Sequence, residues 1–361
     1  MDFDLSQDQY LLQESVRRFL AERLPSERVR SIMETADAHD TALWSELNDL
    51  GVGSLLVPAA HGGLGSEFLD AALVSEELGR ACVSGPFLAA AMASVALAAG
   101  DDDESKAVWL PKIASGDAIV TVAIGEPGGE WRPDRLASKV DDGLITGEKP
   151  LVPYARIADA IVVAASDASG LGLWLVERAS AGVDVSPLRG SDMTRRLDAV
   201  TFTRARARRV GGAQALTRTF DAGLLLLAAD AYGGARRCLD MAARYALERE
   251  QFGQPIGAFQ AVKHQLADLA AALEPALAFL WYSAHAYDHR PDEVSRHAAM
   301  AKAWVCDLFD RTVAASIELH GGIGFTWEFD LHLWFRRAIF DRSFLGDAHL
   351  HRERAAALAH W

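Results

Sequence analysis

The sequence has few cysteines, no excess of basic charge and no long apolar run. Its three cysteines, Cys82, Cys238 and Cys306, are too few and too far apart for a disulfide framework or a cysteine zinc site. Asp and Glu number 50 against 36 Lys and Arg, which gives a net charge of −14. This balance argues against a dedicated nucleic-acid binder, because such proteins need a basic face to neutralise phosphates.

We also recognise neither a membrane segment nor an export signal in the sequence. The best apolar run, residues 223–229, is far shorter than the roughly 18 residues that a membrane span needs. The first ten residues, MDFDLSQDQY, lack the basic start and the apolar stretch of a signal peptide. We also find no spacing that is typical of a metal site. These absences predict a cytoplasmic globular protein of 361 residues that contacts neither nucleic acid nor membrane.

The pattern of apolar residues changes twice along the chain. Residues 1–117 carry apolar side chains at helical spacing, as in 68–82. Residues 118–212 contain short runs rich in Val, Ile and Thr between Gly, Asp and Pro turns, which is typical of a small all-β domain. Residues 213–361 return to long Ala/Leu-rich segments, at 216–250, 261–288 and 294–319. The chain is therefore predicted to be α+β, with helices, a β insert and a helical bundle in that order.

The most specific segment lies at residues 249–264, where a charged turn and a Gly/Pro loop separate two helical stretches. Arg249 and Phe252 are three residues apart, so they share a face if the first helix continues that far. A planar guanidinium can bind a pyrophosphate through two parallel hydrogen bonds, and a neighbouring aromatic ring can cover an adenine or flavin. The alternative is an ordinary helical hairpin with a solvated arginine.

A second segment, residues 318–328, places two glycines directly after a helix. Consecutive glycines allow a backbone to approach a ligand closely and to expose its N–H groups. The alternative is a C-capping loop between two helices.

Together the two segments resemble the acyl-CoA dehydrogenase family, and the resemblance extends over the whole chain. Further matching motifs are Leu56-Val57-Pro58, Gly62-Gly63-Leu64-Gly65, Glu76-Glu77-Leu78-Gly79-Arg80, Gly125-Glu126-Pro127-Gly128 and Gly147-Glu148-Lys149. The resemblance implies an N-terminal helical domain (1–117), a β-barrel or sandwich domain (118–212) and a four-helix-bundle domain (213–361), usually in a tetramer. It also implies that FAD oxidises the Cα–Cβ bond of an acyl-CoA thioester, with an electron-transferring flavoprotein as acceptor.

In this family each FAD is shared across a dimer interface, and the neighbouring subunit holds its ADP half. The resemblance gives that role to residues that the chain largely retains, namely Arg249, Phe252, Phe259, Gln260, Glu318, Gly321 and Gly322. Family members usually carry glutamine at the position of Glu318. A carboxylate there would repel a pyrophosphate unless it is protonated or turned away.

The positions that face the flavin ring differ from the family pattern. The family's Thr-Glu-Pro-Gly-x-Gly-Ser segment has Gly125 in place of the threonine and Trp131 in place of the serine. The aromatic residue that covers the flavin is replaced by Leu151. The hydroxyl residue near the ring is replaced by Pro153, which offers neither a hydroxyl nor an N–H.

The carboxylate base is missing from both usual family positions, which hold Leu345 and Gly223. The family chemistry needs a desolvated carboxylate near Cα to remove the α proton while a hydride passes from Cβ to flavin N5. Asp230 follows Gly223 by about two helical turns and lies on nearly the same face, where burial would raise its pKa. Asp347 is the second acid, with a turn or helix cap as its alternative role.

These features predict an acyl-CoA dehydrogenase-like subunit that has lost autonomous catalysis. It would pair with a complete homologue in a heterotetramer, as in bacterial members that act on sterol side chains and other bulky acyl-CoA esters. One alternative is a self-sufficient homo-oligomeric enzyme that uses Asp230 as its base. Another is a flavin-free structural or acyl-CoA-binding protein on the same fold.

Overall fold

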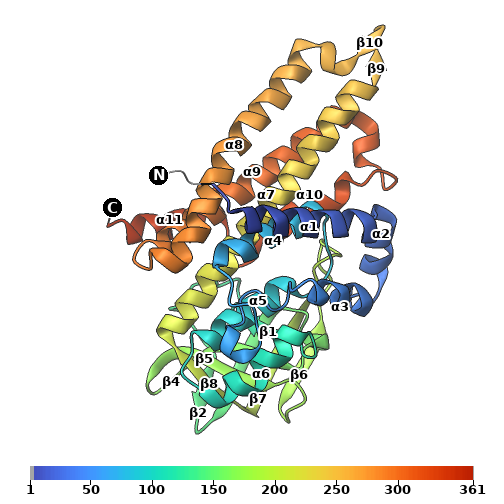
Figure 1. Ribbon diagram of the computed structural model, residues 1–361. Coiled ribbons are helices and arrows are strands. Elements are labelled where there is room, and N and C mark those ends of the chain that lie inside the picture. The colour runs from blue at the N-terminus through green and yellow to red at the C-terminus, as the bar shows by residue number, and fades with distance from the viewer. Residues whose placement is uncertain (1–3, 361) are drawn as a thin grey trace.

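Helices, strands and helices follow one another in the predicted order in a computed structural model, which describes residues 4–360 (Figure 1). Residues 1–3, part of the polar start considered above, and residue 361 lie outside the described residues. The N-terminal helices are α1 (Gln7–Arg23), α2 (Ser26–Glu34), α3 (Thr41–Asp49), α4 (Phe68–Arg80), α5 (Phe87–Ala98) and α6 (Asp103–Ser115).

Helix α5 is buried on nearly all sides. Its sequence, FLAAAMASVALA, is apolar all round, which is expected for a helix with protein on every face. It packs against the long helix α7 (Ala213–Glu248) and against strand β1 (Val120–Ala123). Helix α5 thereby lies at the junction of the three segments, and its Met92 is buried close to Gly223 of α7.

The middle segment forms an eight-stranded mixed sheet. The strands after β1 are β2 (Lys139–Asp141), β3 (Leu144–Pro153), β4 (Ala160–Asp167), β5 (Gly170–Glu177), β6 (Val183–Pro187), β7 (Leu197–Arg206) and β8 (Arg208–Gly212). Their order is β6-β7-β3-β2-β4-β5-β8, and β1 pairs with β4 in parallel, Val120 opposite Ala160. The β3–β7 register shifts between Lys149 and Val152, because Pro150 cannot donate a hydrogen bond to the ladder.

The C-terminal segment contains the longest helices of the described chain. They are α7, α8 (Gln260–His289) and α9 (Val294–His320), followed by α10 (Leu331–Ser343) and α11 (Ala348–Leu358). The first three confirm the helices predicted at 216–250, 261–288 and 294–319. Helices α7 and α8 form a long hairpin that ends in the short strands β9 (Glu250–Gln251) and β10 (Gln254–Pro255), at the opposite end of the molecule from the sheet (Figure 1).

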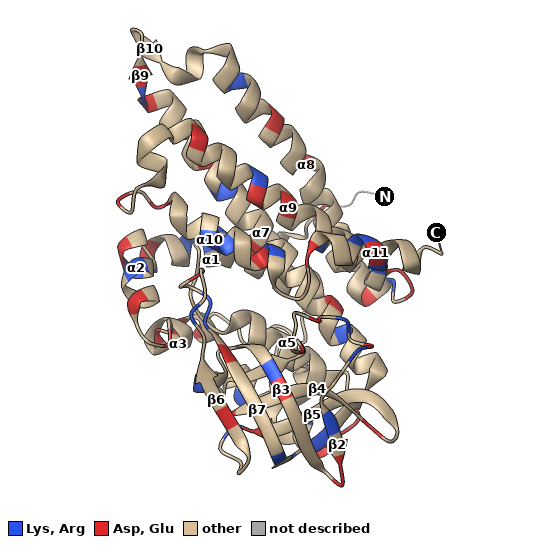
Figure 2. Ribbon diagram, turned by 180° about the vertical axis from the view of Figure 1, so that it is seen from behind, with Lys and Arg blue, Asp and Glu red and all other residues tan. Residues whose placement is uncertain are grey.

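The transitions between the segments are abrupt. Helix α6 ends at Ser115 before β1 begins at Val120, and α7 begins directly after β8. The division at 117 and 212 remains our proposal for the domain limits. Within residues 4–360 no helix combines the length and apolar character of a membrane span. Basic and acidic residues are interspersed over both the helices and the strands (Figure 2).

Candidate functional site

The segment around Arg249 forms the tip of the α7–α8 hairpin. Helix α7 ends at Glu248, and the Arg249 N–H donates to the Tyr245 carbonyl oxygen at 2.8 Å. Because β9 pairs antiparallel with β10, Phe252 and Gly253 are the two residues of the loop. Both have positive φ, +54° and +78°, as a tight two-residue hairpin turn requires. Arg249 and Phe252 therefore lie on a turn, because the helix ends before either of them.

The tip exposes an aromatic ring and a cation. The Phe252 ring is 93% exposed and contacts the Phe259 ring edge-on, with centroids 6.1 Å apart. Arg249 and Gln260 are also exposed, and Arg249 forms no ion pair with any residue between 4 and 360. A bulky residue in the left-handed region is strained, and an exposed ring stabilises its own chain little. These features point to a contact with another molecule.

The glycine segment lies at the same end of the helical domain. His320 ends α9, and its ring stacks on Tyr245 near the end of α7, with centroids 4.3 Å apart. Gly321 has φ +64°, and a Cβ built on Gly321 or Gly322 would meet nothing within 4 Å. The structure thus brings the two signature segments together and leaves the glycine backbone accessible to a ligand.

Glu318 lies one turn before these glycines and is exposed. Its Oε2 accepts a hydrogen bond from Gln265 Nε2 on α8 at 3.4 Å. The Glu318 carboxylate is therefore turned toward α8. A pyrophosphate can bind nearby only if this carboxylate is either protonated or turned away, and the second condition is met.

The expected flavin-ring positions are filled by side chains of this chain. A Cβ at Gly125 would lie 2.8–3.2 Å from three carbons of the Trp131 indole. The indole is buried and packs edge-on against Phe344, with centroids 5.0 Å apart. The loop is fixed from beneath by Lys149, whose Nζ donates to Glu126 Oε1 at 2.6 Å. Glycine at 125 and tryptophan at 131 are therefore complementary substitutions.

The two usual base positions meet in one buried apolar contact. A Cβ at Gly223 would lie 2.5 Å from Leu345 Cδ1 and 2.7 Å from Met92 Cε. Leu345 is 1% exposed, and its carbonyl oxygen accepts a hydrogen bond from His351 Nε2 at 2.9 Å. Lys302 Nζ donates to the neighbouring Gly346 carbonyl oxygen at 2.9 Å. This contact offers no carboxylate, and the loop that contains Leu345 is firmly held.

Asp230 is buried, but arginines surround it. Its Oδ1 accepts from Arg195 Nη2 at 2.5 Å, and Arg337 Nη1 donates to both carboxylate oxygens at 3.1 Å. Burial raises the pKa of Asp230, but the charges of Arg337 and Arg195 outweigh that effect and hold the pKa below its ordinary value. Our expectation of a raised pKa at Asp230 is wrong for that reason. The pKa of Asp341 is instead raised well above its ordinary value by burial and by the charge of Asp230.

The Asp230 ion pairs join the three segments of the chain. Arg337 is fully buried on α10 and also donates to Asp192 Oδ2 at 2.9 Å and to the Val83 carbonyl oxygen at 2.9 Å. A Cβ at Gly79 would lie 2.0 Å from the Asp230 carbonyl oxygen, so α4 and α7 cross very closely there. A base role for Asp230 remains a prediction, and these contacts give it a structural role.

The sequence analysis missed this ion-pair cluster, although one signal was available. An aspartate in an apolar helix is costly to bury without a cation, so a partner should have been sought. The helix-cap alternative for Asp347 is confirmed, since its side chain accepts the Leu350 N–H at 2.9 Å at the start of α11.

Comparisons with known proteins agree with this architecture. The protein-family model for the acyl-CoA dehydrogenase N-terminal domain matches residues 6–117. The family model for the acyl-CoA dehydrogenase C-terminal domain matches residues 211–359. The acyl-CoA dehydrogenase IpdE2 of Mycolicibacterium smegmatis is 33% identical over 343 residues, which cover 95% of this chain and 96% of the relative.

Two solved structures share the whole fold. One is a variant of the Tcur3481–Tcur3483 steroid ACAD, with a TM-score of 0.91 at 29% identity, covering 98% of both chains. The other is the ChsE4–ChsE5 complex from Mycobacterium tuberculosis, with a TM-score of 0.91 at 28% identity, covering 100% of this chain and 99% of that one.

Proposed function

The chain belongs to the acyl-CoA dehydrogenase family, and we propose that it acts there as the catalytically incomplete subunit of a heterotetramer. Its partner is a homologue that contains both the base and the flavin-covering aromatic residue. Homologues in the family hold FAD, which accepts the electrons when the Cα–Cβ bond of an acyl-CoA is oxidised. In our proposal the partner binds the flavin ring, and this chain binds the ADP half.

The contrast between the two halves of the cofactor site supports this proposal most strongly. Beside Gly125 and Gly223, where the family motif places the flavin ring and the base, Trp131 and Leu345 fill the space. In our proposal this chain therefore does not hold a flavin ring at that position. At the hairpin tip, by contrast, Arg249 is exposed and has no ion-pair partner within residues 4–360. A guanidinium in that state can bind a pyrophosphate without first breaking another contact.

The residues that would hold the ADP half have distinct roles. Arg249 would bind the pyrophosphate, while Phe252 and Phe259 would cover the adenine ring. The Gly321 N–H donates to the Glu318 carbonyl oxygen, but no atom lies within 4 Å of where side chains at 321 and 322 would begin, so an anion could approach the backbone of this turn closely. Gln260 is the first residue of α8, and its exposed amide can donate to a phosphate or ribose oxygen.

Two relatives of known structure support a paired assembly and a bulky substrate. The ChsE4–ChsE5 and Tcur3481–Tcur3483 proteins each combine two differently named chains, and the latter is described as a steroid ACAD. We extend both properties to this chain. Its complex would act on a bulky or sterol-side-chain acyl-CoA and would pass electrons to an electron-transferring flavoprotein.

The self-sufficient alternative requires Asp230 to remove a proton. Its carboxylate is occupied by Arg195 and Arg337, and its low pKa leaves it a poor proton acceptor. We therefore prefer the paired assembly. The flavin-free alternative is separated from it by the experiment below.

The test is to express the chain alone and with the homologue encoded next to it, and to measure bound flavin by its visible absorbance. We expect little FAD on the chain alone and one FAD per pair of chains in the complex. Full FAD loading and dehydrogenation by the chain alone would refute the proposal. The proposal would also be refuted if the partner alone bound FAD and catalysed dehydrogenation as well as the complex does.

A matched pair of arginine variants tests the contacts. Arg249 and Arg290 each directly follow a long helix and are exposed, but they lie at opposite ends of α8. Arg249→Ala should release FAD from the complex while the two chains still copurify, and Arg290→Ala should leave FAD in place. Equal FAD content in the two variants would contradict the role of the tip.

A further inference from the structure

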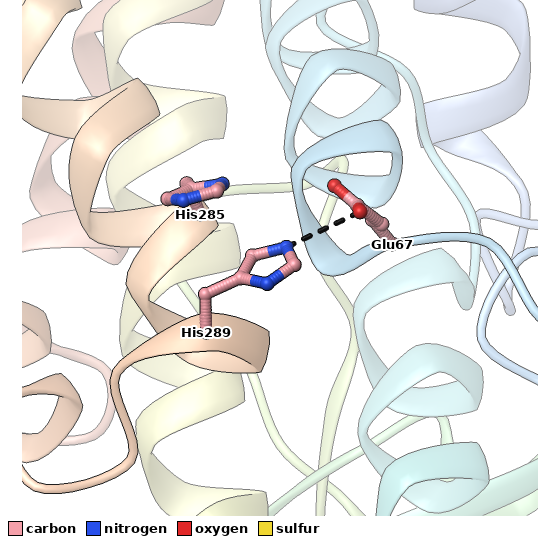
Figure 3. Close-up of side chains that lie close together, drawn as sticks. All are labelled: Glu67, His285 and His289. Carbon is pink, nitrogen blue, oxygen red and sulfur yellow. Dashed lines mark hydrogen bonds and ion pairs between the residues drawn. The ribbon is translucent and has the colours of Figure 1, made fainter. Parts of the chain in front are cut away.

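Two histidines and a glutamate from distant parts of the chain meet on the surface between α4 and α8. His285 and His289 are four residues apart near the end of α8, and Glu67 directly precedes α4 (Figure 3). One ligand atom of each of the three residues can be chosen so that all lie within 4.8 Å of one another. Glu67 Oε1 is 3.2 Å from His289 Nε2, and the two imidazoles stack with centroids 4.1 Å apart.

The backbone that supports these side chains is held by separate contacts. Asp288 Oδ2 accepts the Phe68 N–H at 2.7 Å, so α8 caps the start of α4. The Tyr287 ring stacks on the Phe68 ring with centroids 4.1 Å apart, and the Tyr287 hydroxyl donates to the Arg218 carbonyl oxygen at 3.0 Å. The ends of the two helices are thus fixed relative to one another by residues that would not bind a metal. An ion bound between them needs to order few groups.

Glu67 occupies the N-cap position of α4, but its side chain does not cap the helix. It is the N-cap residue of α4, where a Ser, Thr, Asp or Asn side chain commonly bonds to the first N–H groups. Its side chain makes no such bond, because Asp288 has that role. The Glu67 carboxylate turns to His289 instead, and both side chains are about half exposed.

We infer that Glu67, His285 and His289 form a binding site for a divalent transition-metal ion of the zinc class. Imidazole nitrogens four residues apart on a helix, with one carboxylate, are donors that such ions accept. The three ligands leave room for water on the solvent side. The bound ion links the N-terminal helices to the α7–α8 hairpin. The sequence analysis predicted no metal site because Glu67 is distant in sequence, although the His-x-x-x-His spacing was visible.

The site is independent of the proposed function. His289 ends α8, whereas Gln260 begins it, so the cluster and the hairpin tip are about 45 Å apart along the 30-residue helix. Loss of metal binding would leave the FAD contacts in place, and failure of the heterotetramer proposal would leave the metal site intact.

The test uses the full chain, freed of any histidine tag and of metal by a chelator, and titrated with Zn²⁺ alone. We expect one Zn²⁺ per chain and a rise in the midpoint of thermal unfolding on saturation. His285→Ala and His289→Ala should each weaken Zn²⁺ binding by at least about tenfold and remove the thermal shift. Titration with Co²⁺ should give a visible absorbance band in the wild type that both variants lack.

His349 provides the matched control. It is exposed and lies 3.3 Å from Glu353, so it is a histidine–glutamate pair of similar geometry without a second histidine in the cluster. His349→Ala should leave Zn²⁺ binding unchanged. Absence of stoichiometric binding by the wild type, or equal binding by the wild type and the α8 variants, would overturn the proposal. If an α8 variant unfolds without metal, Glu67→Gln decides, since it must also weaken binding.

Discussion

Phe252, which we propose contacts FAD, allows the cost of a residue in its own chain to be separated from its benefit in binding. The residue has φ +54°, a conformation that costs an L-residue about 1–2 kcal/mol and that asparagine adopts more readily. Because the ring is 93% exposed, its burial contributes no more than about 0.4 kcal/mol at about 25 cal/mol per Å² and about 200 Å² per ring. Within its own chain, Phe252 is therefore a net destabilising residue.

Two substitutions separate these effects. Phe252→Asn removes the ring and relieves the backbone, so the free energy of unfolding of the isolated chain should rise by about 1 kcal/mol. Phe252→Ala removes the ring but keeps the strain, and it should leave stability nearly unchanged. Thermal melts measure the difference, which should be at most about 2–4 °C for a protein of this size.

Both substitutions should weaken FAD binding in the complex to the same extent. Stacking of an aromatic side chain on a base contributes about 1–3 kcal/mol, so the dissociation constant should rise by about 5- to 150-fold. The assay is the flavin absorbance that stays with the protein after the purified complex is diluted and free FAD is removed by gel filtration. If Phe252→Ala retains FAD as the wild type does, the ring has no role in binding. If Phe252→Asn is no more stable than Phe252→Ala, the strain argument is wrong.

Three further predictions concern the interior. Asp230→Asn removes the carboxylate that pairs with the buried Arg195 and one of the two that pair with the buried Arg337, so urea denaturation of the chain should show a loss of about 3–5 kcal/mol. Burial raises the pKa of Glu76 from 4.5 to about 8, so the folded state holds a proton that the unfolded state releases above about pH 4.5. The free energy of unfolding should therefore fall as pH rises from about 4.5 to 8, by at most about 1.4 kcal/mol per pH unit, and Glu76→Gln should remove this slope in melts across pH. Gly125→Thr should clash with the Trp131 indole and cost about 1–3 kcal/mol, and adding Trp131→Ser should recover part of that loss in a double-mutant cycle.

Each of these predictions can fail in a specific way. Wild-type stability in Asp230→Asn, together with loss of flavin reduction, would restore Asp230 as a candidate base. A slope that persists in Glu76→Gln would assign the proton to another group. Strict additivity of the Gly125 and Trp131 changes would show that the two residues do not compensate for one another.

The helices were predictable because their signal is local. Apolar residues at helical spacing predicted α7, α8 and α9 to within a few residues of their bounds, and the Val/Ile-rich runs predicted strands such as β4. The geometry of Arg249 and Phe252 was not predictable in the same way. Whether helix α7 continued through Arg249 and Phe252 depended on whether residues 250–251 and 254–255 would pair as strands. They do pair, as β9 and β10, and α7 ends at Glu248.

The environment of Asp230 illustrates what a single sequence does not supply. Its partners Arg195 and Arg337 lie 35 and 107 residues away, on a loop and on another helix. Burial was correctly expected, but the sign of the pKa shift depends on which charges the fold brings near. The motif resemblance assigned Gly125, Gly223 and Leu345 one by one. It did not reveal that Gly223 and Leu345 touch, because their contact forms between helix α7 and the distant loop that follows α10.

The paired contacts distinguish decay from remodelling in the region where the family motif places the flavin ring and the base. If a binding pocket had only lost its selected residues, the changes would leave cavities, each costing stability in proportion to its volume. Here each small residue faces a large one, Gly125 beneath Trp131 and Gly223 beneath Leu345, and both large side chains are at least nine-tenths buried. Random loss does not match sizes in this way, whereas selection for a well-packed interior does. The same chain keeps an exposed ring in a strained turn at its tip, which the isolated chain would be more stable without. Selection on stability alone would have removed Phe252. We therefore infer that a contact outside the chain maintains the hairpin tip, whereas core side chains fill the position expected for the flavin ring.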